Sequence, residues 1–477
     1  MASIVTNVSS LIAQNALANS QSALNTSLER LSTGLRINSG ADDPAGLIAS
    51  QDLQSEITGI QQAVNNSSQA TNVITTADGA LTEVDSLLDD INGLVVESAN
   101  SGALSPQELQ ANQLQIDSDV QSITRIAGTT SFAGLNLLDG SLNYITSGVA
   151  TSAISALSIS QANLGTQTTM PVDVNVIASA KLADLQFRTS SVSKSVTLEI
   201  GGNSGVQTLS FVSGTTASAI AFAVNRISDS TGVTADLINP ANANSGINFE
   251  STGYGSQSYV SIQAQTGAFQ TTNSSGLSTQ RAVGGDAVAT INGALTVGNG
   301  LNLQLNTSGL DVNLTLNSHV GIGKTGFTIT GGGALFQLGA DVNSQQQVSI
   351  GIGSVAASAL GNSAVGFLND IATGGNASIV SGNAEQASQI VNVAIQQVAQ
   401  LQGRLGAFEK DTLDTNSASL QVALVNVTSS ESDITDADFA SETANMTRDQ
   451  ILVQAGTTVL ATANNTPQNV LTLLQGH

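Results

Sequence analysis

The 477-residue chain has no cysteine and no tryptophan, only two histidines, and few aromatic (3%) or charged (10%) residues. The absence of cysteine excludes disulfide bonds and thiolate metal sites. The two histidines, His319 and His477, lie far apart in the sequence, which argues against a multi-histidine metal site. From these absences we expect a protein that is not an enzyme, with no catalytic residue, no metal and no cofactor.

The sequence also lacks the marks of a secretory leader and of a membrane span. No Lys or Arg precedes Arg30, no apolar signal-peptide core follows, and no run of 18 or more apolar residues occurs. We therefore expect no membrane insertion and, if the protein leaves the cell, export without a cleaved leader.

Positive charge is scarce, and the net charge is −23. Residues 41–140 carry fourteen acidic side chains against one Arg, whereas 1–40 holds only Glu29, Arg30 and Arg36. An acidic body argues against binding to nucleic acid, because phosphates are repelled. Chain ends that are almost free of charge are buried at little desolvation cost, which predicts an interface there.

What the sequence does contain is helical periodicity at both ends, over residues 4–37 and from Phe439 to about Pro467. The predicted apolar stripe on these two helices consists of Leu17, Leu24, Leu28, Leu31, Leu35, Phe439, Met446, Val453 and Leu460. A helix with one narrow apolar seam is marginal alone. We expect the two helices to pair, and the apolar surface left over to drive self-association into a polymer.

Two breaks, 34–43 and 429–438, separate these ends from the rest of the chain. Asp43 is a good N-cap and Pro44 suits the first helical position, so a new helix is predicted from residue 44. The two breaks are predicted to be the two strands of one connector.

Further helices are predicted at 58–98, from the capping box "SPQE" at 105–108 to about 127, and at 384–430. The stripe predicted for the first of these consists of Ala70, Val73, Ala77, Ala80, Val84, Leu87, Ile91 and Leu94.

Between the helices, from about 141, the hydrophobic period changes from 3.6 to 2, with alternating segments such as "VDVNV" (172–176), "SVTLEI" (195–200) and "VNLTLN" (312–317). "GGNSG" (201–205) predicts a hairpin loop, and one helix is expected at 216–228. The predicted fold class is α+β: long-helix coiled-coil termini and a helical bundle formed by both chain ends, with a β-rich variable insert. The expected domains are 1–40 with 439–477 (polymerisation), 41–179 with 380–438 (helical bundle) and 180–379 (surface-exposed insert).

Two motifs invite other interpretations. "GIGKTG" (321–326) is similar to a phosphate-binding loop, but Ser318 stands where that loop needs Gly and a strand-like "FTITGGG" follows, so a hairpin is favoured. Glu83, Asp85, Asp89 and Asp90 form an acidic cluster without the glycine-containing loop of a calcium site, so a solvated helix face is favoured.

The motifs "LSTGLRINSGADDPAGLIAS" (31–50), "TSFAGLNLLDGS" (130–141) and "DITDADFASETANMTRDQILVQAGTTVLATANNTPQNVLTLL" (433–474) closely resemble bacterial flagellin. The resemblance implies an extracellular subunit of the flagellar filament that serves swimming motility. It also implies export, unfolded, by the flagellar type III apparatus. Implied partners are further copies of the chain, an export chaperone, and the filament cap and hook-junction proteins. The alternative is a flagellin-like hook–filament junction protein.

The resemblance has one informative departure. Flagellins detected by the vertebrate innate receptor carry a basic motif near "LQRVRELAVQSAN", and the aligned stretch here is "LLDDINGLVVESAN" (87–100). Asp90 and Asn92 replace the two arginines and Gly93 replaces a glutamate. We expect weak receptor activation.

Overall fold

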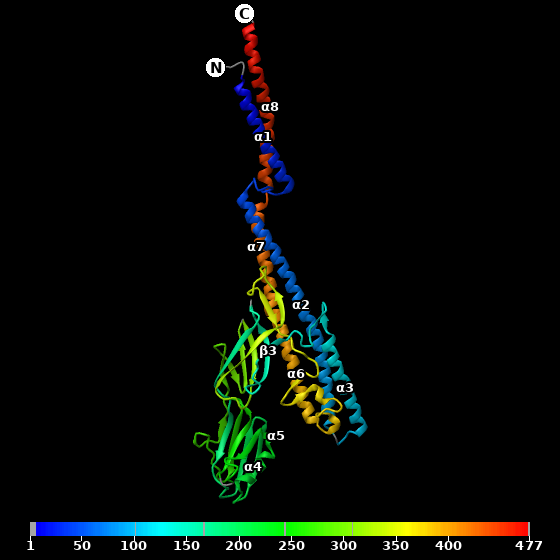
Figure 1. The fold of residues 1–477 in the computed structure, drawn as a ribbon, viewed down its shortest axis with the longest axis vertical. Coiled ribbons are helices and arrows are strands. Elements are labelled where there is room, and N and C mark those ends of the chain that lie inside the picture. Colours follow the sequence, from blue (N-terminus) through cyan, green and yellow to red (C-terminus); the bar gives the residue numbers. More distant parts are fainter. Residues whose placement is uncertain (1–5, 101, 166, 243–244, 308, 476–477) are drawn as a thin grey trace. The chain divides into compact units, whose positions relative to one another are not determined.

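A computed structural model describes residues 6–100, 102–165, 167–242, 245–307 and 309–475. The chain divides into two compact units. The first comprises Met1–Gln69, Leu338–Val342 and Thr412–His477, and the second comprises Ala70–Gln337 and Asn343–Asp411. Figure 1 shows long helices at both chain ends and a β-rich middle. The predicted α+β fold class is confirmed.

The helices of the first unit begin and end where local chemistry requires. They are α1 (Val8–Thr33), the first half of α2 (Pro44–Ser98), α7 (Thr415–Thr435) and α8 (Phe439–Gln475). Asn7 caps α1 by accepting from the Ser10 amide, and Gly34 ends it in the left-handed conformation (φ 77°). The Asp43 carboxylate accepts from the Gly46 amide at 2.9 Å, which confirms the predicted cap before Pro44.

Three predicted helix bounds are corrected. Helix α7 continues to Thr435, so the second break shrinks from 429–438 to the three residues between α7 and α8. Helix α8 continues to Gln475 past Pro467, because a proline removes a single backbone donor without ending every helix that contains it. At the N-terminus, helix α1 begins at Val8 after the cap residue Asn7 rather than near residue 4; Ile4 itself lies outside the described residues.

The second half of α2 packs in the second unit with a seven-residue repeat. The buried positions form two columns, Ile74, Leu81, Leu88 and Val95 together with Ala70, Ala77, Val84 and Ile91. The predicted stripe contained the second column but paired it with Val73, Ala80, Leu87 and Leu94, which are only half-buried. The error arose because apolar residues occupy both flanks of the second column, and sequence spacing alone does not choose between them.

Helices α3 (Pro106–Thr129) and α6 (Ala384–Ala407) complete the helical part of this unit. The predicted capping box is confirmed: the Ser105 hydroxyl accepts from the Glu108 amide while the Glu108 carboxylate accepts from the Ser105 amide at 2.7 Å. The Ser105 amide and, to a lesser degree, the Ser105 hydroxyl donate to the Glu108 carboxylate and lower its pKa. Helix α6 buries Ala387, Ala394, Val398, Leu401 and Leu405, and a π-helical segment, η3 (Phe408–Asp414), follows it.

A segment without α-helix, here called the strap (residues 356–382), packs on α3 and α6. It contains β21 (Gly361–Asn362), β22 (Gly366–Phe367), η1 (Leu368–Ile371) and η2 (Ile379–Ser381). Two glutamine side chains, one buried and one half-buried, hydrogen-bond to the backbone of the strap. Gln113 of α3 donates to the Ile371 carbonyl and accepts from the Ile379 amide. Gln397 of α6 binds both backbone groups of Gly361 at 2.8 Å.

The β-rich part of the second unit forms two subdomains, each with its own apolar core. The inner subdomain has the sheets β14-β13-β5-β18-β3 and β15-β16-β17-β4. Its strands are β3 (Tyr144–Ser147), β4 (Ile154–Ala162), β5 (Met170–Ala178), β13 (Val288–Ile291), β14 (Ala294–Leu295), β15 (Val297–Asn299), β16 (Asn302–Asn306), β17 (Leu310–Leu316) and β18 (Gly323–Gly332). Two small hairpins are β1 (Ser131–Phe132) with β2 (Leu135–Asn136), and β19 (Ala334–Gln337) with β20 (Gln347–Ile350).

The outer subdomain has the sheets β6-β10-β9 and β12-β11-β7-β8, with α4 (Ala217–Asn225) and α5 (Ser228–Thr231). Its strands are β6 (Leu182–Phe187), β7 (Val196–Gly202), β8 (Gly205–Phe211), β9 (Val233–Leu237), β10 (Ile247–Tyr254), β11 (Tyr259–Thr266) and β12 (Arg281–Val283). The chain enters and leaves it at one neck, where the amides of Lys181 and Gly285 each donate to the other's carbonyl at 2.8 and 3.0 Å.

The alternating segments quoted above lie in β5, β7 and β17, as predicted. The predicted "GGNSG" hairpin is confirmed, and only Asn203 and Ser204 form its loop, because Gly202 pairs with Gly205. "GIGKTG" runs into strand β18 with no helix after it, which excludes a phosphate-binding loop.

Candidate assembly surface at the chain ends

Helices α1 and α8 lie side by side and antiparallel (Figure 1). At one end of the pair, Asn7 donates to the Ala463 carbonyl at 2.7 Å. In the middle, a Cβ atom added to Gly456 would lie 3.3 Å from Leu17 Cδ1, so the two backbones approach closely there. At the other end, Arg30 and Glu442 form an ion pair at 3.9 Å. The predicted pairing of the terminal helices is thus present.

No large apolar side chain is fully buried in this pair, among the side chains that the structure describes. Among the described side chains of α1 and α8, the buried residues are Ser10, Ala13, Ser27, Glu442 and Asp449. Only Ala13 is apolar. The large apolar side chains that contact the partner helix are at most half-buried, so the pair obtains only part of the stabilisation, about 25 cal/mol per Å² of apolar surface removed from water, that full burial would give. The pair therefore needs additional contacts to be stable.

The predicted stripe is placed partly between the helices and partly on their surface. Leu17, Leu24, Leu31, Met446, Val453 and Leu460 are half-buried, whereas Leu28, Leu35 and Phe439 are exposed. Phe439 retains 66% of its accessible surface. The nine residues share one helix pair but do not form one continuous buried seam.

The same helices carry a second set of apolar residues; sequence reasoning placed Val8 and Leu11 on a looser stripe upstream of the leucines and missed the other four. These side chains are exposed in the structure: Val8, Leu11, Ile12, Ile451, Leu452 and Val459. Ile12 and Ile451 expose 64% and 61% of their surface. The adjacent pairs Leu11–Ile12 and Ile451–Leu452 were the available signal, because two neighbouring apolar residues widen a helical stripe beyond a single seam.

The two breaks meet in a short backbone bridge, as predicted for the connector. Leu35 pairs with Asp436, and the Arg36 amide donates to the Thr435 carbonyl at 2.6 Å. The Ala437 amide donates to the Gly34 carbonyl at 2.9 Å, and the Arg36 guanidinium donates to the Ile434 carbonyl. Three carbonyls at helix ends, those of Gly34, Ile434 and Thr435, are satisfied in this way.

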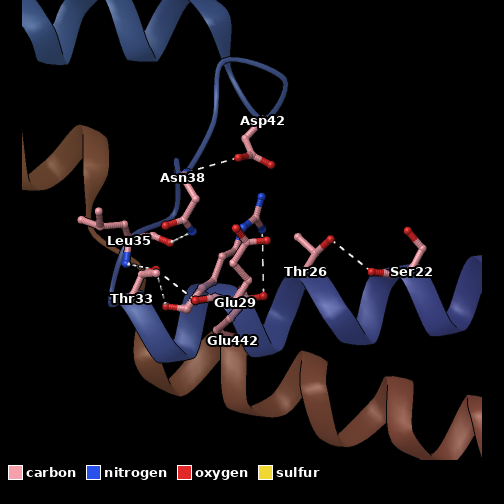
Figure 2. Close-up of polar contacts among 9 residues, drawn as sticks. Ser22, Thr26, Glu29, Thr33, Leu35, Asn38, Asp42 and Glu442 are labelled. Carbon is pink, nitrogen blue, oxygen red and sulfur yellow. Dashed lines mark hydrogen bonds and ion pairs between the residues drawn. The ribbon is translucent and has the colours of Figure 1, made fainter.

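Figure 2 shows how side chains shape the first break. The Thr33 hydroxyl accepts from the Leu35 amide, and the Asn38 side chain donates to the Leu35 carbonyl at 3.0 Å. Asp42 closes the loop by accepting from the Asn38 amide and from the Ser39 amide and hydroxyl. The Ser39 hydroxyl is the main cause that lowers the pKa of Asp42.

Asp90, Asn92 and Gly93, the three positions that depart from the receptor motif, lie on the part of α2 that belongs to the second unit. Asp90 and Gly93 are exposed and Asn92 is half-buried. No atom lies within 4 Å of a Cβ atom added to Gly93, so this face of the helix is open. Asp90 also helps raise the pKa of Asp119, for which burial is the larger cause.

Neither a metal centre nor a membrane-spanning helix is found among the described residues. No three His, Asp or Glu side chains there are grouped so as to hold a metal ion, and no described helix has the length and apolarity needed to cross a bilayer.

Residues 4–143 match the family model of the bacterial flagellin N-terminal helical region, and residues 388–474 match that of the C-terminal helical region. The chain is 31% identical to flagellin of Salmonella rubislaw and 30% identical to flagellin of Salmonella typhimurium, over all of both chains. It is 30% identical to B-type flagellin of Pseudomonas aeruginosa over 98% of its length and 99% of that protein.

Among solved structures, FliC of Burkholderia pseudomallei is 17% identical, with a TM-score of 0.23, over 72% of this chain and 99% of the other. That likeness is too partial to inform the assembly surface.

Proposed function

The chain belongs to the bacterial flagellin family, whose members are structural subunits of the flagellar filament, and we propose that it polymerises through the paired helices α1 and α8. The observation that supports this is the mismatch on these helices: one buried alanine between them and at least six large apolar side chains exposed outside. Neighbouring copies would cover that surface, and the gain would repeat at every subunit.

We also propose that the subunit is exported unfolded by the flagellar type III apparatus and serves swimming motility outside the cell. An export chaperone, the filament cap and the hook-junction proteins would be its partners. A terminal pair with so little buried apolar surface suits transport in an unfolded state, since it costs little to open. The chain has no cysteine, so no disulfide opposes that route.

The domain division is part of the proposal. Residues 1–40 with 439–477 would form the polymerisation domain, 41–179 with 380–438 the helical bundle, and 180–379 the exposed insert. The alternative of a hook–filament junction protein is not favoured, because the relatives that match over the full length are flagellins.

The test compares polymerisation of the full chain with that of residues 1–438. The truncated chain should stay soluble while keeping the helical signal of the second unit. A finer test replaces Ile451 and Leu452, which are 61% and 47% exposed, by Gln. Covering the exposed parts of both is worth about 2 kcal/mol, so the critical concentration for assembly should rise about thirtyfold.

The matched control is Gln450→Ala with Gln454→Ala, two exposed polar positions on the same helix. It should assemble at the wild-type concentration. Sedimentation of polymer and electron microscopy give the readout. Filaments of residues 1–438, or an unchanged critical concentration in the Gln variant, would refute the role proposed for α8.

A further inference from the structure

Strand β8 is a seven-residue strand at the open edge of sheet β12-β11-β7-β8, in the outer subdomain around α4 and α5 (Figure 1). It pairs with β7 over all seven residues without a bulge. Within the part of the chain that the structure describes, the backbone groups of β8 find hydrogen-bond partners only in β7. The groups that point away from β7 are therefore free to pair with another strand.

The other long edges of this subdomain are guarded. On β9, the Asn225 side chain accepts from the Ala235 amide at 2.7 Å and donates to the Ala235 carbonyl at 2.9 Å, in the place of a neighbouring strand. On β6, Gln186 and Thr272 exchange two backbone hydrogen bonds. The edge strand β12 has only three residues. Among these edges β8 is the long one without a described partner beyond β7 along most of its length; α5 packs against its first residue, Gly205, where an added Cβ atom would lie 2.8 Å from the Ser230 carbonyl oxygen.

The sequence of β8, "GVQTLSF", has none of the features that block strand addition. It contains no proline and no charged residue, and charges on an edge are the usual deterrent. Its side chains are mostly exposed, with Val206 at 54%. Val206, Thr208 and Ser210 share the outward face, since Phe211 and Leu209 lie opposite the buried Val196 and Leu198 of β7.

We propose that β8 is a homotypic pairing site, which joins the outer subdomains of two copies by antiparallel β8–β8 hydrogen bonds. A strand without charge offers no attraction to a charged partner, whereas two copies of it bring no charged β8 side chains together, although each chain carries −23. Antiparallel pairing about Thr208 sets Val206 against Ser210 and Thr208 against itself, all compatible cross-strand pairs. The local concentration needed rests on the proposed function, because a filament presents many copies side by side.

The test uses full-length chains, in which any introduced cysteine is the only one. Single variants Val206→Cys, Thr208→Cys and Ser210→Cys place a thiol at successive positions on the outward face of β8. The control is Gln263→Cys, which lies on the same face of the sheet but on the interior strand β11, paired with Glu199 as Thr208 is. Each variant is oxidised both as soluble chain and as pelleted polymer, and dimers are read on non-reducing gels.

Symmetric pairing should give a disulfide-linked dimer at the β8 position nearest the two-fold axis. The yield should exceed that of Gln263→Cys by roughly tenfold or more, because pairing raises the effective thiol concentration to the millimolar range. Equal yields at all four positions, in both fractions, would overturn the proposal.

A charge variant confirms the assignment. Thr208→Lys lies beside Glu199 within the chain, so folding is retained, but two copies bring like charges together at the axis. It should remove at least nine-tenths of the dimer formed when Val206→Cys and Ser210→Cys chains are mixed, because pairing about Thr208 sets these two positions opposite each other, whereas Gln263→Lys, which also lies beside Glu199, should not. Pelleting is scored separately: polymer without a β8 crosslink overturns the pairing alone, and a β8 crosslink without polymer overturns only the proposed function.

Discussion

Gln113 of α3 offers a quantitative test of how the strap is held. Its side chain is 2% exposed and makes four hydrogen bonds. It donates to the Ile371 carbonyl (2.9 Å) and Asp117 (3.0 Å), and it accepts from the Ser378 hydroxyl (2.8 Å) and the Ile379 amide (3.1 Å). Replacing it by Met keeps the length of the side chain but removes every bond.

The expected cost follows from the partners left behind. Ile371, Ser378 and Ile379 contribute three buried polar groups that lose Gln113, and each buried group without a partner costs about 1–3 kcal/mol. Water that enters the gap recovers part of this, so we expect Gln113→Met to weaken the strap by about 3 kcal/mol.

The assay is hydrogen exchange at the Ile379 amide in the unpolymerised chain, because a chain of two units need not unfold in one step. Exchange there should accelerate by roughly two orders of magnitude, since 1.4 kcal/mol corresponds to a factor of ten. Gln115→Met is the control: Gln115 is exposed, on the same helix, and bonds only to Asp119. If Ile379 exchanges equally in both variants, Gln113 does not hold the strap.

Three further predictions concern other parts of the chain. Replacing residues 182–284 by an Asn-Gly turn should leave polymerisation intact, because the chain enters and leaves the outer subdomain at the Lys181–Gly285 neck; loss of filaments on pelleting would show that this subdomain is required. Hydrogen bonds from Ser256 and Gly300 lower the pKa of Asp286 below 3.8, so its contribution to stability is present above that pH and is lost as the pH falls through the folded-state pKa. Thermal melts across that range should show a smaller loss of stability in Asp286→Asn than in the wild type, because the other carboxylates with lowered pKa values, such as Asp42 and Glu108, still titrate in both. The unpolymerised chain should activate the vertebrate flagellin receptor weakly in a reporter-cell assay, and Asp90→Arg with Asn92→Arg should raise the response; full activation by the unmodified chain would place the cause elsewhere.

The features set by local chemistry could be predicted from the sequence. Caps are one example: Asp43 before Pro44, and Ser105 with Glu108, each depend on residues at most three positions apart. The strand periodicity of β5 and β17 is another, because alternation needs only one buried face.

Features set by distant partners could not be predicted. The columns of α2 contain Ile74 and Leu81 rather than Val73 and Ala80, because α2 has apolar residues on adjacent faces and only its neighbours decide which face is buried most deeply. Gln113 has the composition of a surface residue, and only the strap, more than 250 residues away in sequence, makes it a buried hub. The assembly surface shows the same contrast. The pairing of α1 with α8 was predicted from their periodicity, but the buried polar side chains Ser10, Ser27, Glu442 and Asp449 were not.

The neck at Lys181 and Gly285 also bears on how such a chain changes over generations. A segment whose two ends are neighbours is a side branch of the polypeptide, so recombination at two short sites can exchange, shorten or remove it as one cassette. The apolar cores on either side are separate, so the core of residues 182–284 can vary without compensating changes in the core of the inner subdomain, apart from the contact of residues 254–256 with Asp286 and Gly300 at the neck. Variation in lineage is therefore expected to concentrate in that cassette, whereas the bonds of Lys181 and Gly285 are made by backbone atoms and persist whatever side chains are inherited there.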